Sequence, residues 1–295
     1  MVKENFKMKE NFAACVILYH PKKEDIDNLY TYCNKVKKLY IYDNTEGNSN
    51  EELFVEITNA TYYWDGENKG LSDRLNAACQ KAIEDKFEYL LTMDQDSSFL
   101  EENIDCYFEN ILNFPNKNSA ALFNLEYEKE FQPVKKNQIS IKKKDHLITS
   151  ASVMNLNLYH IIGGFDENLF IDGVDIDYCY SAKAKGFDNI QFTNNYFKHS
   201  LGEPVKRGTI YTLFLFKKNK TIHSPLRIYY MYRNMLYLEN KYKNSLPEVI
   251  NELVKNYKHH IKKSIKYSEN IFEANRFKKR AIIDFKNGRM GKIQL

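Results

Sequence analysis

Short apolar runs alternate with segments of helical periodicity over the first 125 residues, and this alternation limits the fold more than any other feature of the chain. The runs are apolar almost throughout, which is typical of strands buried on both faces. Between them, apolar residues recur every three or four positions, as they do along one face of a helix. We therefore predict an α/β domain with a mainly parallel sheet flanked by helices on both faces. The predicted strands are residues 12–19, 39–42, 60–64, 88–93 and 120–125.

Helical spacing separates these strands and then takes over the C-terminal part of the chain. Ser98 and Glu101 form a capping-box pattern, which predicts that a helix opens at Ser98. Ser245 and Glu248 form a second capping box, with Pro247 in the first helical turn. The segments predicted to be helical are residues 26–36, 71–84 and 228–239, followed by a basic amphipathic helix over 250–265.

These elements predict two regions. Residues 1–220 form the sheet domain, which includes an aromatic segment at 211–216. A polar, lysine-rich stretch at 128–145 is expected to be a loop or an exposed hairpin. Residues 221–295 form a helical, basic C-terminal region.

Polar residues follow two of the predicted strands at the edge where a parallel sheet binds its ligands. Asp43 and Asn44 end the second strand, and Asp94 and Asp96 end the fourth. In open α/β sheets, ligands sit outside the carboxyl ends of the strands. Two aspartates one residue apart can approach one hard cation, and oxygen ligands suit Mg²⁺ or Mn²⁺. The spacing leaves a second interpretation open, in which the acids stabilise the N-terminus of the next helix.

Two later segments carry further candidates for chemistry. Residues 163–178 hold five acidic side chains, and Asp175 lies at a predicted helix start, where a carboxylate could act as a general base. Helix capping and a calcium-like loop are the alternatives, although the spacing does not match an EF-hand. His199 follows a predicted strand at 190–193, so it could reach the same sheet edge as a metal ligand. A structural histidine is the alternative.

Taken together, these segments resemble a known family. Residues 12–240 are similar to the family 2 glycosyltransferases with the GT-A fold, in the branch of rhamnosyltransferases and galactofuranosyltransferases. The order and the spacing of the matching segments carry the resemblance. These segments are residues 16–21 (VILYHP), 43–44 (DN), 68–70 (NKG) with Asn76, 94–97 (DQDS), 163–178, His199 and 229–234 (YYMYRN).

The resemblance implies a nucleotide-sugar pocket built from residues far apart in the sequence. Asp43 would lie by the nucleotide base, while Asn68 and Gly70 would line the pocket. Arg233 and Asn234 would contact the diphosphate or the acceptor.

The resemblance also implies a metal centre and a base. Asp94 and Asp96 would hold the ribose and a Mn²⁺ or Mg²⁺ ion, with Asp96 in direct contact with the metal. His199 would complete the metal shell. Asp175 would be the catalytic base of an inverting transfer.

The chain departs from the family pattern in two places. Ser181 stands where relatives commonly have Arg, so one phosphate or acceptor contact is missing from the pattern. Residues 150–152 read Ser-Ala-Ser where relatives often have Ser-Gly.

Charge is distributed unevenly between the two regions. Residues 241–295 carry 14 Lys and Arg against 5 Asp and Glu, a net charge of +9, so residues 1–240 carry −5. A nucleic-acid-binding protein would need a basic face on the body too, so we expect no nucleic-acid partner. We expect the lysines of the tail to contact an anionic membrane. The apolar positions Ile250, Val254 and Tyr257 are expected to pack on the catalytic domain or on a second subunit of a homodimer.

Other features point to the cytoplasm. The five cysteines are scattered and form no CxxC pair, which fits a reducing compartment. The N-terminus lacks the design of a signal peptide, and no apolar run approaches the ~18–20 residues of a membrane span. We expect a cytoplasmic enzyme that is peripheral on the inner face of the cell membrane.

The expected activity is transfer of a sugar from a nucleoside-diphosphate donor to a hydroxyl of a growing cell-surface glycan, such as a capsule, an O-antigen or a lipid-linked precursor. The resemblance suggests L-rhamnose from dTDP-rhamnose first, and UDP-galactofuranose or a UDP-hexose as alternatives. A sugar-nucleotide nucleotidyltransferase would share the sheet and the metal. It would usually carry a Gly-rich loop with Arg or Lys after the first strand, where this chain has Tyr19-His-Pro-Lys-Lys23.

Overall fold

The computed structural model describes residues 9–199, 205–207, 218–220 and 222–294. The chain divides into two compact units: unit 1 is residues 1–166 with 175–200, and unit 2 is residues 167–174 with 201–295. The predicted domain boundary after residue 220 stays a prediction. The predicted aromatic segment at 211–216 lies outside the described residues.

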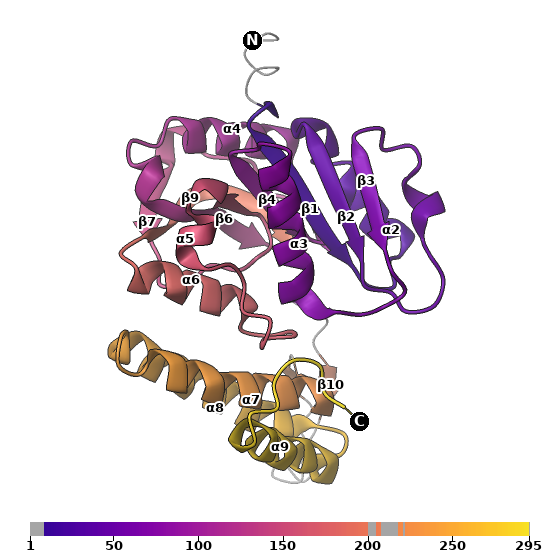
Figure 1. Ribbon diagram of the computed structural model, residues 1–295, viewed down its shortest axis with the longest axis vertical. Helices are drawn as coiled ribbons and strands as arrows, with labels where there is room; N and C mark the ends of the chain where they lie inside the picture. Colours follow the sequence, from indigo (N-terminus) through magenta and orange to yellow (C-terminus); the bar gives the residue numbers. More distant parts are fainter. Residues whose placement is uncertain (1–8, 200–204, 208–217, 221, 295) are drawn as a thin grey trace. The chain divides into compact units, whose positions relative to one another are not determined.

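The described part of unit 1 is built on one nine-stranded sheet, with the order β3-β2-β1-β4-β8-β6-β9-β5 and with β7 paired to β9 (Figure 1). The first four strands in this order, β3, β2, β1 and β4, run parallel to one another. β8 is antiparallel to β4 and β6, and β6 is parallel to β9. The predicted mainly parallel α/β sheet is confirmed. The strands are β1 (Phe12–Leu18), β2 (Lys38–Asp43), β3 (Ala60–Trp64), β4 (Tyr89–Asp94), β5 (Ser97–Ser98), β6 (Ala120–Glu128), β7 (Ser140–Lys143), β8 (Ser152–Asn155) and β9 (Asp188–His199).

Helices cover both faces of this sheet, as alternate side chains of β1 show. Phe12 faces one side, where its ring stacks on Phe108 of α4 at 4.0 Å between centroids. Cys15 faces the other side, beside Cys79 of α3. Both faces of the strand are therefore buried, which explains why its sequence is apolar throughout. The helices of this unit are α2 (Lys23–Leu29), α3 (Gly70–Glu84), α4 (Glu101–Leu112), α5 (Leu156–Ile162) and α6 (Val174–Ala184).

Three sequence predictions need correction. The helix expected over 26–36 ends at Leu29 and is followed by a short 3₁₀ turn. Ser98 does not cap a helix, because it lies in β5 and pairs with β9, and α4 begins at Glu101 without a side-chain cap. Ser245 is not a cap either, since α8 has Leu246 at its N-cap, although Pro247 does occupy the first turn as predicted.

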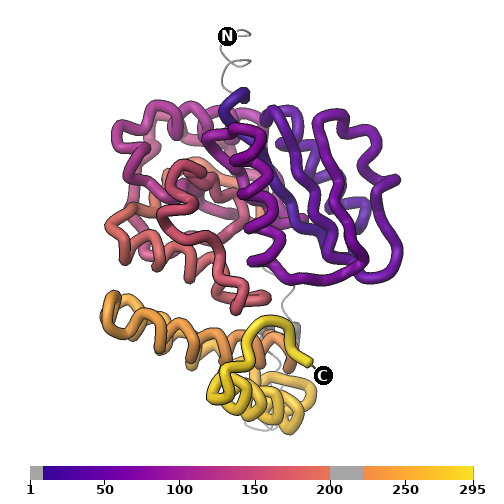
Figure 2. Tube along the Cα trace, in the orientation of Figure 1, coloured from indigo at the N-terminus to yellow at the C-terminus, as the bar shows by residue number. Residues whose placement is uncertain are grey.

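Unit 2 contains three helices among its described residues, α7 (Pro225–Tyr242), α8 (Pro247–Tyr267) and α9 (Ile271–Lys286), in which α7 packs against both others (Figure 2). A short hairpin, β10 (Val205–Arg207) with β11 (Lys218–Lys220), also belongs to it. Residues 167–174 belong to this unit, in which the Asn234 side-chain amide donates to the carbonyls of Ile171 and Asp172, both at 2.8 Å. No helix among the described residues is long and apolar enough to cross a membrane.

Candidate active site

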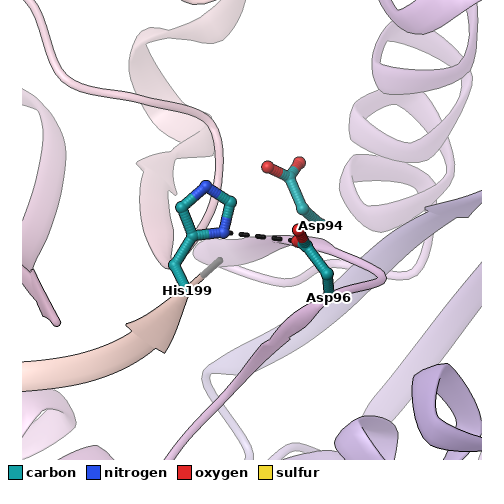
Figure 3. A group of neighbouring side chains, drawn as sticks. All are labelled: Asp94, Asp96 and His199. Atoms are coloured by element: carbon teal, nitrogen blue, oxygen red, sulfur yellow. Dashed lines mark ion pairs between the residues drawn. The ribbon is translucent and has the colours of Figure 1, made fainter. Parts of the chain in front are cut away.

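Two strand ends in unit 1 bring Asp94, Asp96 and His199 together (Figure 3). Asp94 ends β4, Asp96 lies in the turn that follows, and His199 ends β9. One ligand atom from each side chain lies within 4.8 Å of those of the other two. His199 Nδ1 is 3.3 Å from Asp96 Oδ1. The structure therefore gathers the three residues predicted as metal ligands, and their binding of a metal stays a prediction.

Pairing between β5 and β9 explains how a residue 103 positions after Asp96 reaches it. Ser97 and His199 are register partners in this antiparallel pair. The Ser97 hydroxyl lies 2.8 Å from His199 Nδ1 and accepts a hydrogen bond from the Ser150 hydroxyl at 2.7 Å. Ser150 Oγ in turn accepts the backbone N–H of Asp94 at 3.3 Å. The two serines thus join both halves of the triad. The sequence analysis gave neither a role, and only the position of Ser97 beside the two aspartates could have pointed to it.

Gln95, between the two aspartates, anchors the turn to the end of β1. Its side-chain oxygen accepts the backbone N–H of Tyr19 at 2.8 Å, and its carbonyl accepts the amide of Asn28 at 3.0 Å. These two hydrogen bonds fix the turn that carries Asp96. Figure 3 shows the carboxylates of Asp94 and Asp96 on the side of this turn where His199 lies.

The chemistry of the triad fits a hard divalent ion. Two carboxylates and one imidazole suit Mn²⁺ or Mg²⁺. Ligands on opposite sides of an octahedral ion at about 2.1 Å are about 4.2 Å apart. Small side-chain rotations would bring the three ligand atoms within that limit. Burial acts to lower the pKa of His199, but the hydrogen bond to Asp96 and the charges of Asp96 and Asp94 outweigh it, so this pKa is raised above its ordinary value.

This raised pKa predicts how metal affinity depends on pH. A protonated His199 cannot coordinate a metal, so its proton must leave before the ion binds. We expect Mn²⁺ affinity to fall up to about tenfold for each pH unit below the raised pKa of His199, with the fall beginning above the ordinary value. Titration of free Mn²⁺ by electron paramagnetic resonance between pH 5.5 and 8.5 measures this. His199→Gln should bind more weakly, with a flatter profile. Equal profiles for the two proteins would contradict the assignment.

Asp43 lies buried at the end of β2, where its carboxylate shapes the following loop. It accepts the backbone N–H of Thr45 at 2.8 Å, the side-chain amide of Asn50 at 2.7 Å and the hydroxyl of Tyr62 at 2.7 Å. These contacts explain a buried acid at this edge without a ligand. The predicted place of Asp43 by the nucleotide base stays a prediction.

Asn68 and Gly70 lie where α3 begins, next to the end of β2. Asn68 Oδ1 accepts the backbone N–H of Gly70 at 3.1 Å, and the Gly70 carbonyl accepts the amide of Asn44 at 3.1 Å. Gly70 has φ of +85°, which a residue with a side chain rarely adopts. Arg74, which the sequence analysis missed, is buried and donates to Asn44 Oδ1 at 2.8 Å while pairing with Asp65. This network fixes the predicted nucleotide-sugar residues relative to the strand end.

Asp175 is the second residue of α6, as the sequence predicted for a residue at a helix start. Its side chain lines a small cavity together with Thr92 of β4 and Ser152 of β8. Thr92 and Asp94 are two residues apart on one strand, so they share a face of the sheet. Asp175 therefore stands on the same face of β4 as the first member of the triad, and its role as base stays a prediction.

Arg233 and Asn234 lie buried in α7 of unit 2, where both have structural partners. The Arg233 guanidinium donates to the Tyr229 hydroxyl at 3.1 Å and to the carbonyl of Gly291 at 2.8 Å. Asn234 holds the segment 167–174, as described above. The structure thus accounts for both residues within unit 2, and their predicted contact with the diphosphate or the acceptor stays a prediction.

Ala151, which stands where the family resemblance leads one to expect glycine, has a left-handed backbone conformation. It is buried, with φ of +56°, a conformation that costs any residue with a side chain about 1–2 kcal/mol. Its carbonyl accepts the Tyr107 hydroxyl at 3.0 Å, so the backbone is held in place. Glycine at this position would relieve the backbone strain, but it would also lose one buried methyl group, which costs about 0.8 kcal/mol.

We therefore expect Ala151→Gly to raise the free energy of unfolding by about 0.5–1 kcal/mol, because the relieved backbone strain exceeds the lost burial. Urea unfolding followed by circular dichroism measures this, with Ala14→Gly as a control at a buried alanine of β1 that lies in regular register with both neighbouring strands. The control should be less stable than the wild type. A lower stability for Ala151→Gly as well would contradict the strain assignment.

Comparison with known proteins agrees with the α/β sheet. No family model matches the chain. A dTDP-rhamnosyl transferase, RfbF of Shigella flexneri, is 26% identical over 254 residues, which cover 79% of this chain and 81% of the relative.

Two solved structures share the fold. The S. aureus TarS fragment 1–349 in complex with UDP-GlcNAc matches 93% of this chain and 80% of its own, with a TM-score of 0.55 and 12% identity. GalNAc-T7 with UDP, GalNAc and Mn²⁺ matches 64% of this chain but only 44% of its own, with a TM-score of 0.51 and 9% identity. The chain therefore has a fold of the GT-A type and is distantly related in sequence to a glycosyltransferase.

Proposed function

We propose that this protein is a metal-dependent, inverting glycosyltransferase, and that it moves L-rhamnose from dTDP-rhamnose to a hydroxyl of a growing cell-surface glycan. The observation that carries the proposal is the triad of Asp94, Asp96 and His199 at the carboxyl edge of the sheet. The choice of donor rests on the distant relationship to a dTDP-rhamnosyl transferase.

The residues of the site divide the chemistry between binding and proton transfer. Asp94, Asp96 and His199 would hold a Mn²⁺ or Mg²⁺ ion, which supplies Lewis-acid stabilisation of the negative charge on the departing diphosphate. The oxygen of the acceptor hydroxyl bonds to the anomeric carbon of the donor while the bond from this carbon to the diphosphate breaks. Asp175 removes the proton of the hydroxyl in the same step. One displacement of this kind inverts the anomeric configuration.

The nucleotide part of the donor would bind along the ends of β1, β2 and β4. Asp43 shapes the loop beside the proposed site of the nucleotide base. Asn68 and Gly70 would line the nucleotide-sugar pocket at the start of α3. Arg233 and Asn234 are proposed to act near the diphosphate or the acceptor.

Release of the nucleoside diphosphate tests this proposal. The protein is incubated with Mn²⁺ and one of dTDP-rhamnose, UDP-galactofuranose, UDP-glucose or UDP-GlcNAc, with a lipid-linked glycan extract as acceptor. We expect dTDP release to be the fastest, and to stop with EDTA. Faster release of UDP would instead identify a UDP-sugar as the donor. The structural match to a UDP-GlcNAc complex favours this second candidate. Pyrophosphate formed from a sugar phosphate and a nucleoside triphosphate would instead identify a nucleotidyltransferase.

A lipid-linked acceptor would place the enzyme at the inner face of the cell membrane. The residues after Asn240 include 14 basic and 5 acidic side chains. This basic balance supports the location, because anionic lipids attract clustered lysines.

A further inference from the structure

One face of α9 carries exposed apolar side chains that a water-facing helix would not need. Phe272 is 90% exposed and Ile283 is 51% exposed, and both are large hydrophobic residues. They are 11 residues apart, which is close to three helical turns, so they lie on one side of the helix. The opposite side holds the buried residues Ala274, Ala281 and Asp284, which pack within unit 2. α9 therefore has one face that packs and one apolar face that does not.

The same exposed face is basic. Arg276, Lys279 and Lys286 are exposed and lie within about 50° around the helix axis of the line from Phe272 to Ile283. None of the exposed residues along this line is acidic, and the nearest acid, Glu273, lies off to its side. We call Phe272, Arg276, Lys279, Ile283 and Lys286 the α9 face.

This combination selects one kind of partner. Lysine and arginine heads attract an anionic surface, while an aromatic and an aliphatic side chain gain free energy only where an apolar phase lies directly beneath that surface. An anionic bilayer offers both within one headgroup layer. Nucleic acid offers phosphates without an apolar phase for Ile283. A two-fold contact with a second copy would set the same cations against one another.

The geometry points to the α9 face as the surface on which this protein docks to an anionic lipid bilayer, with Phe272 and Ile283 inserted among the lipids. The sequence analysis had assigned membrane contact to the lysines of the C-terminal tail in general. The structure narrows the contact to one helix face and adds the apolar residues. Vesicle binding needs no turnover, so its failure would leave the proposed sugar transfer untouched.

Vesicle co-sedimentation of the full chain tests this inference. We expect binding to vesicles of equal parts phosphatidylglycerol and phosphatidylcholine, and at least tenfold weaker binding to pure phosphatidylcholine. The double variant Phe272→Ser with Ile283→Ser should bind anionic vesicles at least tenfold more weakly, as should Lys279→Glu with Lys286→Glu. Matched controls in unit 1 are Val55→Ser, at a side chain that is 74% exposed, and Lys142→Glu with Lys144→Glu. The controls should bind like the wild type.

A second measurement separates insertion from simple attraction. In Phe272→Trp, anionic vesicles should shift the added tryptophan emission to shorter wavelengths, whereas the wild type, whose one tryptophan is Trp64 in unit 1, should show no such shift. The inference is overturned if the wild type does not bind anionic vesicles, or if the serine variant binds them as tightly. It is also overturned if the wild type is a dimer in solution and the serine variant is a monomer, because a second copy would then cover the face.

Discussion

Replacing Asp96 by Asn is expected to lower the rate of sugar transfer by roughly 10²–10³-fold at saturating donor. A metal that stabilises the leaving diphosphate supplies several kcal/mol, and each 1.4 kcal/mol corresponds to about tenfold in rate. Asp96 is the carboxylate in contact with His199, so its loss removes a charge from the triad and the partner of the imidazole. The amide keeps the shape of the side chain and separates the effect of charge from that of packing.

The measurement is the initial rate of nucleoside-diphosphate release over a range of Mn²⁺ concentrations. Asp105→Asn is a suitable control, because Asp105 forms a surface ion pair with Lys35 at 2.9 Å, away from the triad. Surface pairs of this kind contribute at most about 1 kcal/mol. The control should keep the wild-type rate, while Asp96→Asn should need more Mn²⁺ and stay slow at saturation. A variant with wild-type rate and wild-type Mn²⁺ dependence would rule out Asp96 as a metal ligand.

Replacing Asp175 by Asn is expected to slow transfer by about 10²–10⁴-fold and to leave donor affinity within about twofold of the wild type. An amide cannot accept the proton of the acceptor hydroxyl, and a positioned general base is worth this range of rate. The donor affinity should persist because the proposed metal ligands and pocket residues are unchanged. Binding of the donor is followed by calorimetry, and transfer by product formation.

Asp172 provides the comparison for this test. It lies in unit 2 with φ of +66°, and its carboxylate pairs with Arg227 at 2.5 Å. Burial raises the pKa of Asp172, while the charge of Arg227 acts in the opposite direction. Asp172→Asn should therefore lower the free energy of unfolding, while the rate of transfer per folded molecule stays close to that of the wild type. If Asp175→Asn retains full transfer and Asp172→Asn does not, the base is Asp172.

The sheet was predictable because its central strands are buried on both faces. Continuous apolar runs such as residues 12–18 leave little choice other than a parallel α/β sheet. The four-residue β8 carries no comparable signal and was missed. The helix cap predicted at Ser98 was wrong because the local sequence does not record pairing with a distant strand. A serine before an acidic helix start has the same local pattern whether it caps the helix or pairs with such a strand.

The site was predictable in its members but not in its supports. Asp94 and Asp96 stand at a strand end, and His199 follows another strand, where the family resemblance favoured a metal ligand over a structural histidine. The role of Ser150 depends on three contacts between residues more than 50 positions apart, which no local pattern records. The assignment of residues 167–174 to unit 2 likewise depends on contacts with residues far along the chain, among them Asn234 and Arg227.

The most direct test of the account is a crystal structure of the protein soaked with dTDP and Mn²⁺. The account predicts an anomalous manganese peak at about 2.0–2.3 Å from a carboxylate oxygen of Asp96 and a ring nitrogen of His199. Diphosphate oxygens should complete the coordination of the metal. The thymine base of the nucleotide should lie beside the loop that Asp43 shapes. A nucleotide bound elsewhere, or bound at this edge with no metal between it and the triad, would contradict the account.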